Sequence, residues 1–172
     1  NHMAIMYAYA LYKRGFVHQG HFVLATLYRH CRDFAQCRIY PGIPEYMDNQ
    51  GRGLYHYLTG SASWYLLTLV TEAFGVKGIL GDLCLVPKLT KADFPAANTS
   101  SITTVFAGRK LTVTYENPKL LDYGTYQIGV VKLNGLLLKD QAPGEQVLIK
   151  RELITQLPPG QEIKITVVLD RR

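Results

Sequence analysis

The chain of 172 residues is poor in cysteine, in extended apolar runs and in clustered charge. Its three cysteines are an odd number and none stands in a CxxC pair, so neither a disulfide framework nor a metal site is indicated. No secretory leader is recognisable, and the most apolar stretch, residues 62–74, is too short to span a membrane and contains Glu72. Internal repeats and low-complexity tracts are also missing. We therefore expect a cytoplasmic protein without a membrane partner, with Cys31, Cys37 and Cys84 as reduced thiols.

Positive charge is in excess but dispersed. The formal charge is +6, yet lysines and arginines occur singly or in pairs, and no basic stripe of the kind that binds nucleic acid is present. We predict no nucleic-acid partner, and a solvated surface that attracts phosphate or sugar phosphate. A hydrophobic content of 48% is ample for a packed core of one domain, or of one and a half.

The apolar pattern changes its period once along the chain. Helical spacing over residues 3–16, 19–32 and 62–74 predicts three helices, the first two forming an αα-hairpin. The first helix starts without a cap, which favours a fragment of a longer protein. From residue 79 onward, six segments alternate or run apolar, which predicts strands at 79–89, 102–106, 110–115, 126–133, 146–149 and 162–169. The fold class is α+β, with helices in residues 1–75 and an antiparallel β-sandwich in 76–172.

A long connection separates the hairpin from the third helix. Residues 33–58 show little periodicity, and a loop of this length in a compact domain is usually functional or disordered. Pro41 and Pro44 restrict the backbone and are expected to place Glu45 and Arg52. Each of these two residues serves either a site or as half of a structural ion pair. Four tyrosines suit stacking against sugar rings and equally suit packing over a helix end: Tyr40, Tyr46, Tyr55 and Tyr57.

The third helix begins at Thr59-Gly60-Ser61, which supplies hydroxyl groups and bare backbone where a helix has unpaired N–H groups. Such a start can bind an anion. The simpler interpretation is that Thr59 or Ser61 caps a buried helix, and the spacing alone favours the cap. The apolar residues on nearly every face of 62–74 predict that this helix is buried.

Three segments carry a resemblance to a known family: CRIYPGIPEY (37–46), GRGLYHYLTGSASW (51–64) and FGVKGILGDLCLVPKL (74–89). They closely resemble the C-terminal part of glycoside hydrolase family 94, the inverting β-glycoside phosphorylases that include cellobiose, cellodextrin and chitobiose phosphorylases. The resemblance covers roughly residues 1–117 and fades into general β-sandwich similarity beyond them. It implies that residues 1–75 are the last helices and the phosphate loop of an (α/α)6 barrel, followed by the C-terminal sandwich.

The resemblance also implies site residues. The phosphate-binding Thr-Gly pair of the family falls on Thr59 and Gly60, and a phosphate-binding histidine that precedes a barrel helix falls on His2. Asn1-His2-Met3 is also typical of the remnant of a cloning tag, so a native and an artificial origin of His2 both stay open. Of the other histidines, His56 is expected to be packed and hydrogen-bonded, whereas His18, His21 and His30 are expected at the surface or in packing.

The family needs a general-acid aspartate from an earlier barrel loop, and no residue here matches its motif; Asp33, Asp48, Asp82 and Asp93 are not assigned that role. We therefore predict no catalytic residue, no metal and no cofactor in this chain. The expected function is the C-terminal fragment of a phosphorylase that uses inorganic phosphate to cleave β-glucosides and release α-glucose 1-phosphate, with the fragment itself inactive.

Two alternatives remain. One is a non-catalytic module for carbohydrate binding or assembly, and the other is the terminal domain of a cyclic β-glucan synthase. In every case, we expect the apolar faces of the first and last helices to be exposed in the isolated chain. Such faces favour a homodimer or another association.

Overall fold

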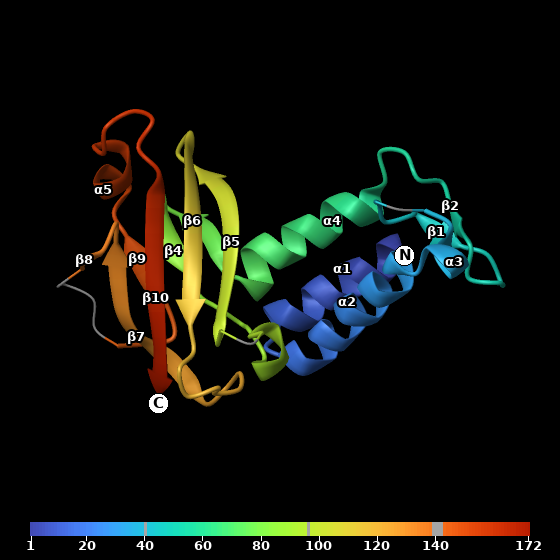
Figure 1. Cartoon of the computed structure of the whole chain (residues 1–172), viewed down its shortest axis with the longest axis horizontal. Helices are drawn as coiled ribbons and strands as arrows, with labels where there is room; N and C mark the ends of the chain where they lie inside the picture. Colours follow the sequence, from blue (N-terminus) through green and yellow to red (C-terminus); the bar gives the residue numbers. More distant parts are fainter. Residues whose placement is uncertain (40, 96, 139–142) are drawn as a thin grey trace. The chain divides into compact units, whose positions relative to one another are not determined.

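The structure is a computed structural model that describes residues 1–39, 41–95, 97–138 and 143–172. Tyr40, one of the four tyrosines singled out above, lies outside the described residues. The chain divides into two compact units, Asn1–Ala73 and Phe74–Arg172, which are described separately. The first is mainly helical and the second mainly β-structure, so the predicted α+β class is confirmed (Figure 1). No helix in the described ranges combines the length and the apolar character needed to cross a bilayer.

Three helices form the body of the first unit. Helix α1 (His2–Lys13) and helix α2 (Val17–Arg32) are joined through Gly15, whose φ of 83° lies in the left-handed region. Helix α4 (Gly60–Thr68) packs against α1 and continues as a short π-helix, Leu69–Ala73 (Figure 1). The predicted helices are thus confirmed, with ends shifted by a few residues. Gly20 lets α1 approach closely, because a Cβ there would stand 2.6 Å from the ring of Tyr12.

The core of this unit is one stripe from each helix, and the other apolar side chains are half-buried or exposed. Ile5, Ala8 and Leu24 are buried, and the hydroxyl of buried Tyr65 donates to the carbonyl of Leu24 at 3.3 Å. The prediction that the third helix is buried is wrong for this chain, because an apolar surface remains after one face has been packed. The exposed apolar residues of α1 and α4 match the expectation for the isolated chain: Met3, Tyr7, Leu66 and Leu67.

The long connection contains more regular structure than its sequence predicts. Asp33 begins helix α3 (Phe34–Cys37), since its carboxylate accepts the amides of Ala35 and Gln36 at 3.0 and 3.3 Å. Strands β1 (Tyr46–Met47) and β2 (Gly53–Leu54) then form a small antiparallel hairpin. Two-residue strands cannot be recognised from alternation alone, which is why the sequence shows an irregular loop here.

The second unit contains two sheets. The three-stranded sheet has the order β3-β4-β9, with β3 at Val76–Ile79, β4 at Asp82–Leu85 and β9 at Val147–Ile149. The five-stranded sheet has the order β5-β6-β10-β7-β8. Its strands are β5 (Thr99–Phe106), β6 (Arg109–Glu116), β7 (Tyr126–Leu133), β8 (Leu136–Leu137) and β10 (Ile163–Arg171). A 3-10 turn, Lys91–Asp93, and helix α5 (Arg151–Thr155) lie between strands and were not predicted.

Strand β10 occupies the middle of the larger sheet although it is the last strand of this sequence. It pairs with β6 in parallel and with β7 antiparallel, and alternate side chains of β10 from Ile163 to Leu169 are buried. The predicted antiparallel arrangement holds for the remaining pairs of this sheet, whereas the β6–β10 pair is parallel. The alternation of buried residues identifies these segments as strands but does not determine the direction of their partners.

Candidate functional site

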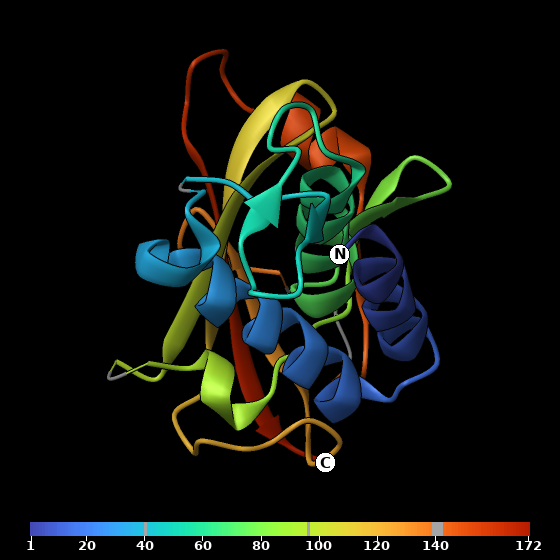
Figure 2. The same ribbon diagram turned by 90° about the vertical axis from the view of Figure 1, so that its right-hand side faces the viewer.

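The N-terminus of α4 brings together the three residues that the family resemblance assigns to phosphate. Thr59 is the N-cap, Gly60 is the first helical residue, and the imidazole of His2 lies directly against Gly60. A Cβ at Gly60 would stand 2.5 Å from His2 Cε1, so only glycine accepts the ring at this distance. Figure 2 shows the chain's N-terminus beside this helix start and the β1–β2 hairpin. Residues from opposite ends of the first unit therefore form one cluster.

Glu45 supplies the negative charge of this cluster. One carboxylate oxygen, Oε1, lies 2.8 Å from His2 Nδ1. The other, Oε2, accepts the Ser61 N–H at 3.0 Å and the Ser61 hydroxyl at 3.2 Å. The Ser61 N–H lowers the pKa of the Glu45 carboxyl, and the His2 ring lowers it further, against the opposing effect of partial burial. Of the two roles that the sequence left open for Glu45, the structure shows the structural one, with the carboxylate held by His2 and Ser61.

The backbone around Glu45 is fastened as well. The amino terminus of Asn1 donates to the Glu45 carbonyl at 2.6 Å, and the Asn1 side chain donates to the Pro44 carbonyl at 2.9 Å. These bonds hold the first residues of α1 against the loop that carries Glu45. The position of the His2 ring is therefore fixed from both sides, by the backbone before it and by the carboxylate beside it.

Thr59 has a capping role. Its hydroxyl oxygen accepts the Ala62 N–H at 3.0 Å, and its hydroxyl hydrogen is donated to the Ile43 carbonyl at 2.8 Å. The side chain is buried, and the capping interpretation is confirmed. Because a hydroxyl has a single hydrogen, Thr59 can donate to a bound anion only after releasing the carbonyl of Ile43.

Two polar groups at the helix start have no hydrogen-bond partner in the part of the chain that the structure describes. The Gly60 N–H makes no hydrogen bond there, and His2 Nε2 is a buried nitrogen without a hydrogen-bond partner. The carboxylate beside Nδ1 assigns a proton to that nitrogen, so Nε2 is an acceptor in the neutral ring and a donor in the imidazolium. The arrangement can hold one oxyanion, and in this chain the oxyanion is Glu45.

The other residues highlighted by the sequence have clear positions. His56 is exposed and makes no hydrogen bond with described residues, so the prediction of a packed His56 is wrong. The rings of Tyr46 and Tyr55 stack with centroids 6.5 Å apart, and both are exposed, as is Tyr57; packing over the helix end does not apply to them. His30 packs as expected, with Nε2 2.7 Å from the Gly51 carbonyl oxygen.

The four aspartates without an assigned catalytic role all serve local structure. Asp33 caps α3, and Asp48 accepts two amides of the β1–β2 turn. Asp82 pairs with Lys150 at 2.8 Å, and Asp93 completes a capping box with Thr90. In the described ranges, no three histidine, cysteine or acidic side chains gather as they would around a metal ion. Cys31, Cys37 and Cys84 are buried free thiols.

No protein-family model matches the chain, and no curated protein matches it either.

Proposed function

We propose that the chain is the C-terminal part of an inverting β-glycoside phosphorylase and that it supplies part of the phosphate pocket. In this proposal the first unit contributes the last helices of an (α/α)6 barrel, and the second contributes a β-sandwich. The observation that carries the proposal is the meeting of His2 with Thr59 and Gly60 at a helix N-terminus. Nothing in the local sequence around either segment requires that meeting.

The proposed phosphate-bound state follows from the charges already present at the N-terminus of α4. The positive end of the α4 dipole accommodates the carboxylate of Glu45, so the position favours negative charge. A phosphate replaces the Glu45 carboxylate as the acceptor of the Ser61 N–H. It also accepts hydrogen bonds from the free Gly60 N–H and from a protonated ring nitrogen of His2. Phosphate then takes the place of the water that an inverting glycosidase uses, so a single general acid is sufficient. Asp33, Asp48, Asp82 and Asp93 are engaged in a cap, a turn or an ion pair, and the proposal places that acid on an upstream barrel loop.

The test for phosphate binding uses the 172-residue chain and amide NMR. Inorganic phosphate, titrated at constant ionic strength, should shift the Gly60 and Ser61 amides saturably, and His2→Gln should weaken that binding by about tenfold or more, as expected for a charge-assisted hydrogen bond. Thr59→Ser keeps the capping hydroxyl and should leave phosphate binding within about twofold. Thr59→Ala removes the hydroxyl, and with it both the helix cap and the contact to phosphate. Shifts confined to exposed lysines would contradict the proposal.

Activity is tested in a protein that joins this chain to an upstream barrel. Such a protein should release α-glucose 1-phosphate from a β-glucoside only when phosphate is present. The His2→Gln variant should raise the phosphate requirement while leaving the choice of leaving group unchanged. Hydrolysis without phosphate dependence would rule out phosphorolysis.

A second candidate function, an assembly module, is favoured by the exposed apolar residues of α1 and α4. These side chains would be covered in a homodimer or by a larger host. The discriminating measurement is the mass in solution over a dilution series, with Leu66→Ser as the test variant and Val105→Ser, an exposed residue of the second unit, as the control. Association that only Leu66→Ser weakens, together with no phosphate binding, would favour assembly over phosphorolysis.

A further inference from the structure

The segment Gly51-Arg52-Gly53 has no part in the site at α4, yet its backbone is tightly fixed. Gly51 has φ of 83°, and a Cβ there would stand 2.9 Å from the ring of His30. The Asp48 carboxylate accepts the amides of Gln50 and Arg52, both at 2.9 Å. The Asp48 N–H in turn donates to the Arg52 carbonyl at 3.0 Å. The turn therefore presents the Arg52 side chain from a rigid base.

Gly53, on the other side of Arg52, is enclosed more closely still. A Cβ at this position would stand 2.8 Å from Ile39 Cδ1, 2.8 Å from Pro44 Cγ and 3.1 Å from the Cys37 carbonyl oxygen. The strand that follows Arg52 is thus packed against the segment that leaves α3. This packing fixes the β1–β2 hairpin relative to the end of that helix.

Arg38 stands at that end of α3 and is also held by its backbone. It is the C-cap residue with φ of 62°, and its N–H donates to the Phe34 carbonyl at 3.1 Å. The left-handed conformation turns the chain at this position. Two arginines from separate segments are therefore placed on backbone that cannot adjust freely.

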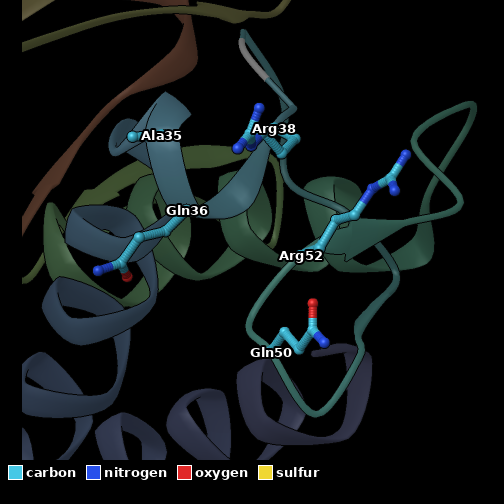
Figure 3. Close-up of a pocket in the computed structure, with 5 residues that line it drawn as sticks. All are labelled: Ala35, Gln36, Arg38, Gln50 and Arg52. Carbon is cyan, nitrogen blue, oxygen red and sulfur yellow. The ribbon is translucent and has the colours of Figure 1, made fainter.

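Arg38 and Arg52 line an open surface pocket of about 650 Å³ together with Ala35, Gln36 and Gln50, and all five residues are exposed. In Figure 3 the two exposed guanidinium groups point in different directions, so a shared ligand requires both side chains to turn toward it. Among the described residues, no acidic side chain lines this arginine pocket. Within the described ranges, neither guanidinium makes a hydrogen bond or an ion pair. Asp48 lies in the same turn as Arg52, but its carboxylate accepts hydrogen bonds from backbone amides instead. The pocket thus has two arginines at its rim without a counter-charge from any described residue. None of its residues belongs to the cluster at the start of α4.

We propose that the arginine pocket binds a small phosphate monoester that carries hydroxyl groups. The two guanidinium groups match the charge of a monoester, about −1.5 to −2 at neutral pH, and their forked N–H donors fit phosphate oxygens. The two glutamine amides can donate to and accept from hydroxyl groups. The volume lies within the range of small-molecule sites, roughly 300–1,000 Å³, and the polar lining does not suit an apolar ligand.

The test is a titration of the 172-residue chain with a hexose 6-phosphate at constant ionic strength, followed by NMR of the arginine Nε–Hε groups. Saturable shifts are expected at Arg38 and Arg52. Arg38→Gln and Arg52→Gln should each weaken binding by about tenfold or more, the loss expected for a charge-assisted contact. The matched control is Arg14→Gln, which removes the same charge from an exposed position at the end of α1 and should change affinity by less than about twofold.

Several results would overturn the proposal. An equal loss in Arg14→Gln would show a general charge effect, and citrate bound more tightly than the ester would show a carboxylate site. Inorganic phosphate bound as tightly as the hexose phosphate would remove the role of the hydroxyl groups, and the absence of saturable shifts would remove the site. The amides of Gly60 and Ser61 report separately on the α4 site, so either proposal can fail without the other. Circular dichroism of each variant should match the native chain because both arginine side chains are exposed.

Discussion

Replacing Glu45 with alanine tests the anion at the start of α4 directly. The substitution removes the acceptor of the Ser61 N–H and the partner of His2 Nδ1, and it leaves the backbone bonds from Asn1 in place. The Ser61 N–H is then buried without a partner, at a helix end that favours negative charge. We expect the first unit to become less stable while the second unit is unchanged.

The size of the effect follows from three contributions. Losing an acceptor at a helix N-terminus costs about 0.5–2 kcal/mol, and losing a charge that complements the helix dipole costs about 0.3–1 kcal/mol. The His2 contact adds less than about 1 kcal/mol, since the His2 side chain is 36% exposed and solvent screens the pair. A total of about 2 kcal/mol lowers the melting temperature of a unit of this size by about 8–16 °C.

Trp64 provides the assay because it is the only tryptophan of the chain and lies in α4. Its ring centroid is 6.4 Å from that of His2 and 5.3 Å from that of Tyr9, so its fluorescence reports the melting of the first unit. The control is Glu162→Ala, which removes an exposed carboxylate of the second unit. It should leave the Trp64 melt unchanged.

Anion rescue provides the refutation. Phosphate present at ten times its dissociation constant from the variant should restore about 1.4 kcal/mol, and it should stabilise Glu45→Ala more than the native chain. The reasoning would be refuted by a Trp64 melt within about 2 °C of native, or by phosphate that stabilises both proteins equally.

Three further outcomes are expected. The Glu45 carboxyl has a pKa below its usual 4.5, chiefly through the Ser61 N–H, so the stability it gives is present above pH 4.5 and is lost as the pH falls through the lowered pKa. Thermal melts followed by Trp64 from pH 6 to 3 should show a loss of stability that the Glu45→Gln variant lacks. Gly53→Ala should cost about 1–3 kcal/mol in urea unfolding, because its Cβ would overlap Ile39 and Pro44, and a neutral result would place these atoms farther away. Burial, with a second cysteine nearby, raises the pKa of Cys31 to about 12, so iodoacetamide at pH 8 should modify it only after unfolding; modification at the rate of free cysteine would contradict this burial.

Much of the fold could be predicted because periodicity reports burial. The three helices and most strands lie where the 3.6-residue and two-residue patterns predict them. The pattern fails near Leu80-Gly81: the predicted strand 79–89 contains β4, whereas β3, which pairs with β4 across this turn, lies before it and was not predicted except for Ile79. Leu80 has φ of 50° and is fully exposed, so an apolar residue stands where turns usually have asparagine or glycine. Strand β8 and helix α5 are too short to show a period.

The site was predictable only in part. Thr59 as a cap follows from residue type and position, but the approach of His2 to Gly60 depends on how α1 packs against α4 and was expected only from the family resemblance. The pairing of Glu45 with His2 and Ser61 depends on the same tertiary packing. Tyr-His-Tyr at 55–57 carries no information on which side faces solvent, which is why the prediction for His56 was wrong.

The central position of β10 has a consequence for synthesis on the ribosome. The β5–β6 hairpin can form early, whereas β6 and β7 cannot be bridged until residues 163–171 have left the exit tunnel. Until then two long strand edges stay open to neighbouring nascent chains. Without residues 163–171, the β5–β6 and β7–β8 pairs would not be joined by hydrogen bonds into one sheet. A product truncated before residue 163 should therefore aggregate or be degraded.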